Sequence, residues 1–506
     1  MRYTFDEAMD MVATGVARIG DELEFTGLVD ITATSQDSPL VEHKATNGSQ
    51  FLCLHIIVVG CGIGGLSAAY CLGRVGHKIT VLEQASEIKD VGAGIQVSPN
   101  LSRLLIRWGL GKQLQSLATR PEALKFLKYS NGEMIGWTKW GNRMEEDHGA
   151  PYYHLHTYHK CCTPSLHHTL RLSSKVVSVL VDPGTGIGTV KLENGDSVSG
   201  DLIIGADGIK SIIREAVLHG PSDRDTDTNT QVKKLTIPIH TGDCACRAVI
   251  STAGMRGDPE LEGLLERKEI MCWMGPLKHI IGYCIRGGKE YNLVLVHPEN
   301  GSNSRAKELY MAEGSVEQMR ADFEGWEPRV QKLLKFVDKT YVWPLMYREP
   351  LDKWVDTDGR VTLLGDACHP TLPSRAQGSA MAVEDAAVLG SLLAHISHHK
   401  QLQILLHAYQ DIRYARTRET QLAALANHNT FHLEDGPAQR ARDESMRSAM
   451  NTVMEHAQGA EEEMDGNMNM WADRKKSQLQ FCYDAEAEAE RWWVEHEITT
   501  GGWRGS

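Results

Sequence analysis

The stretch His55-Ile56-Ile57-Val58-Val59-Gly60-Cys61-Gly62-Ile63-Gly64-Gly65 decides the fold of this chain of 506 residues. It begins with an apolar run that is typical of a parallel strand covered on both faces. Gly60, Gly62 and Gly65 then give the spacing G-x-G-x-x-G. In such a turn the first glycine permits the tight bend, the second lets the backbone approach a pyrophosphate, and the third lets helix and strand pack closely. A helix predicted over residues 66–74 directs its N-terminal N–H groups at the phosphates.

A second predicted strand delivers an acidic side chain to the same place. Residues 78–82 are apolar enough to form that strand, and Glu83 follows it directly. An acid about 20 residues after the glycine turn can accept a hydrogen bond from a ribose hydroxyl. The strand, turn, helix and acid together favour dinucleotide binding over a chance glycine-rich turn in another α/β domain.

Two later segments also end a predicted buried strand in an aspartate. Residues 201–214 contain the pattern D-G-x-x-S-x-x-R, which begins at Asp207, and residues 361–370 contain Gly-Asp-Ala-Cys-His-Pro, with Asp366 at the strand end. A helix is predicted over residues 378–393. Open α/β sheets bind ligands at the carboxyl ends of their strands. We therefore expect the three segments to meet around one ligand.

The three motifs, in this order and at these separations, resemble those of the FAD-dependent aromatic hydroxylases with the p-hydroxybenzoate-hydroxylase-like fold. The closer similarity is to fungal salicylate-hydroxylase-like monooxygenases, since residues 91–95, 348–351 and 431–437 resemble the connecting signatures of that subgroup. The resemblance covers roughly residues 56–493. It implies an α/β fold, with an FAD-binding Rossmann-like domain, an inserted antiparallel-sheet substrate domain and C-terminal helices.

The resemblance also implies a division of the chain into domains. The expected parts are an N-terminal extension over 1–54, a discontinuous FAD-binding domain over 55–125, 165–223 and 350–425, a substrate domain over 126–164 and 224–349, and a C-terminal helical region over 426–506.

By resemblance, the first motif holds the ADP half of FAD, Asp366 binds the ribityl chain, and Asp207 lies near FAD and the path of NAD(P)H. An alternative for the second motif is an ordinary turn at Asp207 with Ser211 as a helix N-cap. The N-terminus of the helix over residues 378–393 is expected to face the flavin ring, where it favours negative charge by about 1 kcal/mol. The expected cofactor-binding residues are Gly60, Gly62, Gly65, Glu83, Ala93, Gly94, Asp207, Asp366, Gly378 and Ser379.

The family chemistry implied by the resemblance needs FAD, NAD(P)H and O2. NAD(P)H reduces FAD, and the reduced flavin captures oxygen as a C4a-hydroperoxide that delivers OH to a phenolic or salicylate-like ring. The cofactor carries the reaction, while the protein supplies orientation and excludes water.

Two residues are the expected catalytic contacts to the substrate. Residues 224–343 lack a βαβ rhythm and contain apolar extended pieces at 234–238, 248–251 and 291–296, which favours an antiparallel sheet over the flavin. The resemblance suggests that Arg247 and Tyr283 face the substrate there. The alternatives are a surface arginine and a core tyrosine. His279 and His369 are weaker candidates, because most lone histidines are structural.

Residues 157–175 depart from the family pattern. Thr157 stands where an FAD-contacting arginine is expected, and Lys160 is a poor replacement because a point charge lacks the bidentate fork. A helix is expected to resume at residues 166–170 and to stop about a dozen residues early, too short for a crossover. Ser374 also replaces a tyrosine that is common in the subgroup. Thr157 and the shortened helix raise the alternative of a catalytically impaired flavin-binding protein.

Composition excludes several other classes of protein. The net charge of −13 and the lack of basic runs with interleaved aromatic residues disfavour nucleic acid as a partner. The eleven cysteines include no C-x-x-C pair, so we expect no metal site, and a reducing, cytoplasmic compartment fits them best. Residues 1–54 lack the apolar block of a secretory signal, and no apolar stretch is long enough to span a membrane.

The C-terminal part is expected to be helical and charged. Arg413, Arg416, Arg418 and Glu419 suggest a solvated helix face, and Trp492 and Trp493 are expected to pack the last helix onto the body.

Three functions other than aromatic hydroxylation stay open at this point. One is an epoxidase or a dearomatising monooxygenase that acts on a polyketide-type secondary metabolite, and another is the impaired flavin-binding protein. The third is a simple NAD-linked dehydrogenase, which the Gly365-Asp366 motif disfavours because such an enzyme has no ribityl chain to bind. The substrate, the choice between NADH and NADPH, and the oligomeric state are also open.

Overall fold

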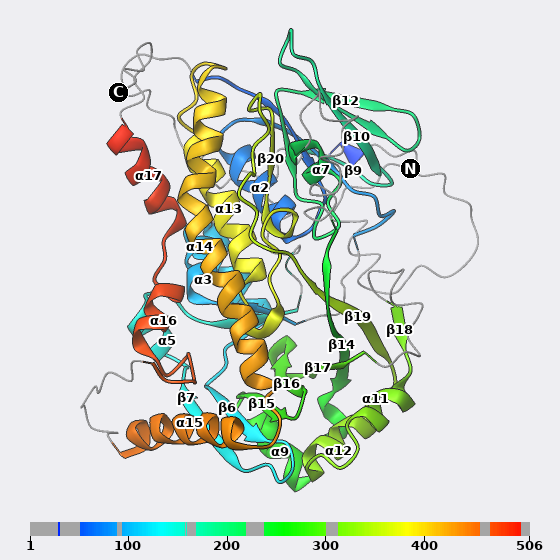
Figure 1. The fold of residues 1–506 in the computed structure, drawn as a ribbon, viewed down its shortest axis with the longest axis vertical. Helices are drawn as coiled ribbons and strands as arrows, with labels where there is room; N and C mark the ends of the chain where they lie inside the picture. Colours follow the sequence, from blue (N-terminus) through cyan, green and yellow to red (C-terminus); the bar gives the residue numbers. More distant parts are fainter. Residues whose placement is uncertain are drawn as a thin grey trace.

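The computed structural model describes residues 29–30, 51–88, 94–156, 158, 168–218, 237–299, 312–455 and 466–496. Two large sheets dominate this part of the chain, with long helices beside them (Figure 1). The fold is the expected mixed α/β one, with a parallel Rossmann-like core, antiparallel sheets and C-terminal helices. The assignment of residues to domains stays a prediction.

The six-stranded sheet carries the three motifs. Its order is β1-β9-β3-β2-β13-β20, and all strand pairs are parallel except β1 with β9. The strands are β1 (Val29–Asp30), β9 (His168–Arg171), β3 (Lys78–Leu82), β2 (His55–Val59), β13 (Leu202–Gly205) and β20 (Val361–Leu363). The ends of β2, β13 and β20 are therefore neighbours at one edge of the sheet, as the motifs predict.

Two helices pack against each other beside this sheet. Helix α2 (Ile63–Arg74) follows the glycine turn and begins three residues before the predicted start at Leu66, because helical geometry extends into the turn itself. Helix α13 (Gly378–Leu393) has the predicted bounds. Most residues of both helices are buried. Helix α13 lies between α2 and the helix α14 (Gln401–Phe431).

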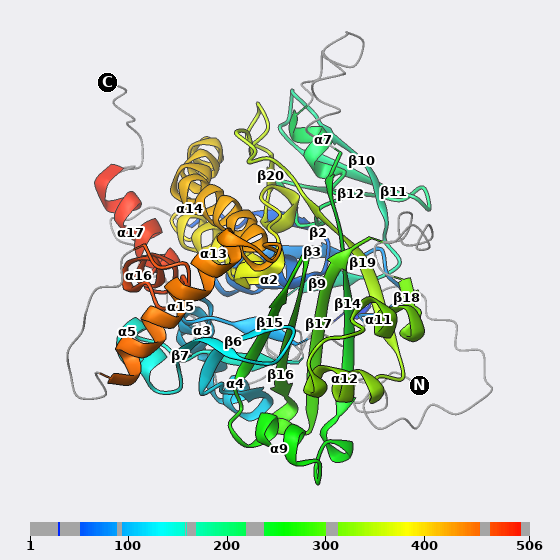
Figure 2. The same cartoon turned by 60° about the horizontal axis from the view of Figure 1, so that its bottom comes forward.

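The eight-stranded sheet corresponds to the expected substrate sheet. It is antiparallel except between β15 and β6 (Figure 2). In spatial order its strands are β18 (Ala312–Gly314), β19 (Thr340–Tyr347), β14 (Ile239–Ser251), β17 (Glu290–Pro298), β16 (Lys278–Ile285), β15 (Ile270–Gly275), β6 (Ala123–Lys128) and β7 (Met134–Lys139). The apolar pieces predicted at 248–251 and 291–296 lie in β14 and β17. Residues 237–238 precede the sheet, and 234–236 lie outside the described residues.

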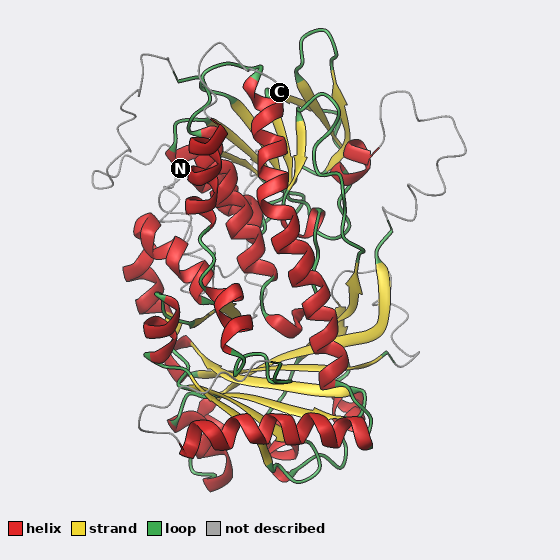
Figure 3. Cartoon of the chain, turned by 60° about the vertical axis from the view of Figure 1, so that its left-hand side comes forward, coloured by secondary structure: helices red, strands yellow, loops and turns green. Residues whose placement is uncertain are grey.

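Helices cover both faces of this sheet (Figure 3). Alternate residues of β14 face opposite sides of the sheet. Cys246 and Ala248 pack toward the helices α9 (Pro259–Glu266), α11 (Val316–Asp322) and α12 (Pro328–Lys335), whereas Ala245 packs toward α14. The other helices and strands are α3 (Pro99–Leu105), α4 (Gly111–Leu117), α5 (Arg143–His148), α7 (Ile213–Leu218), α15 (Pro437–Glu455), α16 (Arg474–Phe481), α17 (Ala485–His496), β4 (Ile95–Val97), β5 (Ala118–Thr119), β8 (Tyr153–Leu155), β10 (Val176–Val181), β11 (Gly188–Leu192) and β12 (Ser197–Gly200).

The helix expected to resume at residues 166–170 was a wrong prediction. Residues 168–171 form β9, which pairs in parallel with β3, and Leu170 is buried in the sheet core. Pairing with a buried strand supplies hydrogen bonds and apolar contacts that an isolated short helix lacks. Thr157, Lys160 and residues 166–167 lie outside the described residues.

The C-terminal tryptophans confirm the expected packing of the last helix. Trp493 of α17 stacks on His395 with ring centroids 4.3 Å apart, and Trp492 packs against the main core. Within the described residues, none of the helices is both long and apolar enough to cross a lipid bilayer.

Candidate active site

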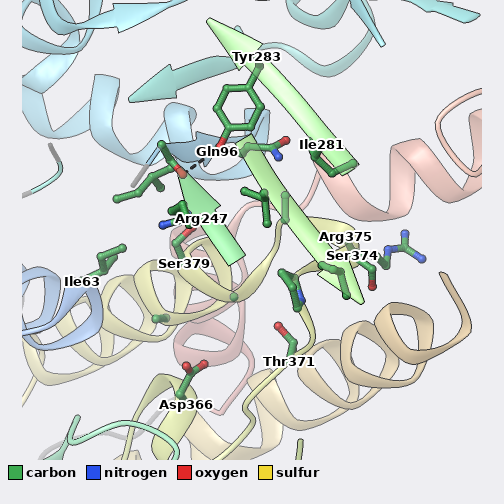
Figure 4. Close-up of a pocket in the computed structure, with 18 of the residues that line it drawn as sticks. Ile63, Gln96, Arg247, Ile281, Tyr283, Asp366, Thr371, Ser374, Arg375 and Ser379 are labelled. Carbon is green, nitrogen blue, oxygen red and sulfur yellow. Dashed lines mark hydrogen bonds between the residues drawn. The ribbon is translucent and has the colours of Figure 1, made fainter. Parts of the chain in front are cut away.

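A cavity of about 590 Å³ lies where the strand ends of the six-stranded sheet meet one face of the eight-stranded sheet (Figure 4). All three motifs contribute to its wall, through Gly62 and Gly64, through Ala206 and Gly208, and through Gly365 and Asp366. The N-terminal residues Gly378 and Ser379 of α13 complete this side. The prediction that distant segments meet around one site is therefore met by the geometry.

The glycine turn is shaped for a close ligand. A Cβ on Gly60, whose φ is +103°, would lie 2.4 Å from the Ala206 carbonyl oxygen, and one on Gly65 would lie 2.0 Å from the Gly60 oxygen. A Cβ on Gly62 would meet no atom within 4 Å. The outer two glycines thus permit close backbone packing, while the middle one faces open space, as a pyrophosphate site requires.

Glu83 lies at the end of β3, next to this turn. Its carboxylate accepts hydrogen bonds from the backbone N–H groups of Cys61 at 2.8 Å and Ala85 at 2.9 Å. Burial, together with the Glu83 charge, raises the pKa of the Cys61 thiol to about 12. The acid is thus fixed beside the glycine turn, and Cys61 stays a neutral thiol.

The second motif is built as a helix cap. Asp207 accepts hydrogen bonds from the Ser211 hydroxyl at 2.6 Å and from the Ile212 N–H at 2.8 Å, and the Ser211 oxygen accepts one from the Arg214 N–H. Burial raises the pKa of Asp207. The carboxylate of Asp207 is turned toward this cap, whereas its neighbours Ala206 and Gly208 line the cavity. The structure therefore has the geometry of the turn-and-cap alternative.

Arg214 joins the second motif to the third. Its guanidinium donates to the carbonyl oxygens of Ala367 at 3.0 Å and Cys368 at 3.1 Å. This contact explains the arginine in the pattern D-G-x-x-S-x-x-R, because it fixes the loop after Asp366 against β13.

Asp366 projects into the cavity from the turn after β20 (Figure 4). Desolvation by the surrounding protein raises the pKa of its carboxyl; His369 opposes this rise and Asp385 adds to it. Asp385 supports the turn from behind, by accepting hydrogen bonds from the Gly365 N–H at 3.0 Å and from His369 at 2.6 Å. His369 is thus engaged in the support of the turn, and it does not line the cavity.

The expected solvated face of α14 was a wrong prediction for two arginines. Arg413 is fully buried and pairs with Glu384 at 2.7 Å and Asp385 at 2.8 Å, and the side chain of Arg416, only 12% exposed, also pairs with Glu384. Two acids on the buried helix α13 need cationic partners, so these arginines point inward. Arg418 and Glu419 are exposed, as expected.

Gly94 and Tyr283 meet across the cavity wall. The Tyr283 hydroxyl donates to the Gly94 carbonyl oxygen at 2.9 Å, and its ring lies 4.1 Å from that of His154. Burial raises the pKa of Tyr283 to about 12. The tyrosine is therefore a neutral hydroxyl that holds the Gly94 segment to β16. Ala93 lies outside the described residues.

Arg247 enters the cavity from β14 and lies over the ring of Trp343, with its guanidinium carbon 5.2 Å from the ring centroid. On the neighbouring strands, His279, Ile281 and Tyr283 alternate along β16 and all line the cavity. The cavity face of the large sheet thus presents one cation among apolar and aromatic side chains.

Sequence reasoning missed several wall residues. Phe431 and Trp471 come from the C-terminal region, and Trp140 and Gln96 from segments without a motif. The Gln96 amide oxygen accepts a hydrogen bond from Tyr152 at 2.6 Å. No local pattern marks Gln96, Trp140 or Trp471, and the signature over residues 431–437 does not indicate that Phe431 reaches the cavity, since only the tertiary fold brings these residues together.

Comparison with known proteins agrees with this geometry. Residues 54–240 and 350–423 match the family described as FAD binding domain. The chain is also 34% identical over 410 residues to the FAD-dependent monooxygenase OpS4 of Beauveria bassiana (strain ARSEF 2860), which covers 80% of this chain and 91% of that protein. This chain belongs to the FAD-dependent monooxygenases of the aromatic hydroxylase type. Family membership excludes the simple NAD-linked dehydrogenase.

A further relative of this monooxygenase is named for a hydroxylation of a single aromatic ring. The 3-hydroxybenzoate 6-hydroxylase of Klebsiella oxytoca is 33% identical over 371 residues, which are 72% of this chain and 85% of that enzyme. Among solved structures, the complex of Klebsiella pneumoniae HpxO with FAD and uric acid has a TM-score of 0.66 at 24% identity, covering 84% of this chain and 97% of that one. A salicylate hydroxylase substrate complex has a TM-score of 0.65 at 20% identity, with coverage of 87% and 97%. These structures share the fold.

Proposed function

We propose that this monooxygenase uses NAD(P)H and O2 to hydroxylate a phenolic or salicylate-like aromatic substrate. The observation that supports it best is the position of Arg247, which faces, across one apolar cavity, the wall that the three FAD motifs form. A substrate bound by Arg247 would lie between the large sheet and the flavin site.

The residues of the motif wall fit FAD. The open space above Gly62 suits the pyrophosphate, Asp366 is placed to accept hydrogen bonds from the ribityl chain, and the backbone N–H groups of Gly378 and Ser379 can donate to the flavin ring. When bound, FAD supplies hydride acceptance and oxygen activation. The positive end of α13 stabilises negative charge on the reduced ring by about 1–2 kcal/mol.

Arg247 is the proposed anchor for an anionic group of the substrate. A guanidinium binds a carboxylate or phenolate through charge-assisted hydrogen bonds, each worth about 1.5–3 kcal/mol. Trp343 beneath it holds the guanidinium in place, since a cation over an aromatic face is attracted to it. Tyr283 contributes by fixing the Gly94 segment next to the bound ring.

The rest of the cavity is suited to keeping water out. Its wall includes Leu124, Phe126, Ile270, Ile281, Val294 and Val296. An apolar site that excludes water favours hydroxylation of the ring over the release of peroxide. The free thiols of the described chain favour a reducing, cytoplasmic compartment for the enzyme.

A second candidate is epoxidation or dearomatisation of a larger, polyketide-type substrate. The aromatic walls formed by Trp140, Trp343, Phe431 and Trp471 favour it, because they offer more stacking surface than one benzoate ring can cover. The two candidates differ in the size of the molecule that stimulates turnover.

The test is substrate-stimulated oxidation of NADH and NADPH by the purified yellow protein under air. A panel of salicylate, hydroxybenzoates and multi-ring phenols is compared, and mass spectrometry with ¹⁸O2 detects oxygen in the product. Stimulation by single-ring acids with ¹⁸O incorporation supports the first proposal, and stimulation by multi-ring phenols alone supports the second. Flavin-loaded protein that oxidises neither nicotinamide with any member would indicate the impaired flavin-binding protein.

A further inference from the structure

Three side chains that no motif connects meet at the end of α14. His428 and His432 are four residues apart on the last helical turn, where the His432 N–H donates to the His428 carbonyl oxygen at 3.2 Å. Residues at this spacing lie on one face of a helix. Both rings face Asp243 of β14, so the cluster lies between the long helix and the large sheet.

The donor atoms of this cluster are close together. The Asp243 carboxylate lies 2.7 Å from His428 Nε2 and 3.7 Å from His432 Nδ1, and the three ligand atoms lie within 4.8 Å of one another. Zinc binds imidazole nitrogen and carboxylate oxygen at about 2.0–2.2 Å, which in a tetrahedral site puts neighbouring ligand atoms about 3.3–3.6 Å apart. The contact of Asp243 with His428 has to widen by about 0.6 Å or more to admit the ion, whereas its distance to His432 is already close to this range.

We propose that Asp243, His428 and His432 form a binding site for one divalent transition-metal ion, with Zn²⁺ as its occupant. Two imidazoles and one carboxylate are a ligand set that this class of ion accepts, with water in the remaining position. The sequence does not indicate the site, because Asp243 and His428 are 185 residues apart in the chain and no C-x-x-C pair is involved.

The charge of the cluster favours a cation. No lysine or arginine of the described chain forms an ion pair with Asp243, whose ionic partners there are the two histidines. A divalent ion would supply the positive charge that no lysine or arginine of the described chain brings to this carboxylate by an ion pair.

A third histidine orients one of the ligands. His279 Nδ1 lies 2.7 Å from His432 Nε2, on the side of the ring away from Asp243. When His432 donates from Nε2, its Nδ1 is left as a lone pair directed at the site. Metal-binding histidines are commonly fixed in this way by a hydrogen bond at the other ring nitrogen.

The ion would act as a clamp on the cavity wall. His279 and Phe431 both line the cavity, and both adjoin the cluster. A metal bond from α14 to β14 would hold these two residues in register. The ion would keep the side chains of this wall ordered. Its site is separate from the FAD site.

The first experiment measures metal content in untagged, FAD-loaded protein. The protein is treated with a chelator, dialysed against Zn²⁺ and analysed for zinc. We expect one ion per chain, a higher midpoint of thermal unfolding with zinc than without it, and loss of both effects in Asp243→Asn and His432→Gln. His407→Gln is the matched control, because this exposed histidine lies on the same helix and bonds only to a backbone oxygen.

Two results would overturn the proposal: wild-type protein that binds no zinc, or variants that keep the single ion. X-ray absorption at the zinc edge of the wild-type protein tests the ligands without any variant. Two imidazoles with oxygen scatterers support the site, whereas sulfur scattering would assign the ion to cysteines elsewhere. None of these readouts depends on catalytic activity, so the metal site and the proposed reaction fail or succeed independently.

Discussion

The hydroxyl of Tyr283 donates a hydrogen bond to the carbonyl oxygen of Gly94, 2.9 Å away, across the wall of the cavity. The two residues are 189 positions apart, and the bond ties the segment beside the proposed flavin site to the large sheet. This contact makes Tyr283 a positioning residue for the Gly94 segment. The contact of Tyr283 with substrate, which the resemblance suggests, stays a prediction.

Replacement of Tyr283 by phenylalanine should lower stability and coupling while FAD is retained. The Gly94 oxygen loses its donor, which costs about 1 kcal/mol of unfolding free energy. Chemical denaturation measures the loss, and a larger share of the consumed NAD(P)H should appear as hydrogen peroxide. Tyr291→Phe is the matched control, because its buried hydroxyl has no hydrogen-bond partner in the described structure and its removal should cost nothing. Equal losses in the two variants would contradict this role.

Asp366→Ala should reduce the FAD content of the purified protein. Loss of a charged hydrogen-bond acceptor corresponds to about a tenfold or greater weakening of FAD binding. The ratio of flavin to protein absorbance and a titration of apoprotein with FAD measure it. Asp358→Ala, in an exposed turn, is the control. Unchanged flavin content in the Asp366 variant would remove this residue from the cofactor site.

Arg247→Ala should leave FAD bound but raise the KM for an anionic substrate by about 10- to 100-fold, since one or more charge-assisted hydrogen bonds are lost. Arg247→Lys should recover only part of this, because an ammonium lacks the planar fork. Steady-state NAD(P)H oxidation measures both variants. The exposed Arg256→Ala serves as control, and an unaltered KM in Arg247→Ala would leave Arg247 with a purely structural role.

The His369–Asp385 pair should make stability depend on pH. Burial alone would lower the pKa of His369, but the contact with Asp385 raises it well above 6.5. Burial likewise raises the pKa of Asp385, yet His369 and Arg413 hold it at about 2, below its ordinary 3.8. Stability from the histidine is therefore complete below pH 6.5 and is lost as the pH rises through its folded-state value. Stability from the aspartate is complete above pH 3.8 and is lost as the pH falls through about 2.

His369→Gln tests the upper limb of this dependence. The variant should be about 1–3 kcal/mol less stable than wild type below pH 6.5, and the difference should shrink as the pH rises. Urea unfolding at a series of pH values measures it. A difference that stays constant up to the alkaline limit of folding would refute the raised pKa, and the exposed His407→Gln should show no such trend.

The sequence predicted those parts of the site that are local. Three parts of the site follow from short motifs in which a strand or helix pattern adjoins a turn. They are the glycine turn, the aspartate after β20 and the N-terminus of α13. Arg413 was predicted wrongly, because a charged residue on a helix gives no local sign that two buried acids lie opposite it.

Contacts between distant segments could not be predicted in this way. Trp471 reaches the cavity and Asp243 reaches His428 only through the packing of the C-terminal helices on the large sheet. The strand β9 also formed where a helix was expected, since pairing with β3 depends on a partner about ninety residues earlier in the chain.

The participation of Phe431 and Trp471 in the cavity has a consequence for the order of events during synthesis. All three FAD motifs precede these two residues in the chain, so Phe431 and Trp471 are the last residues of the cavity lining to be synthesised. Domains fold as the chain emerges, N-terminal parts first. The cavity wall is therefore completed only when the C-terminal segments that carry these two rings pack onto the large sheet.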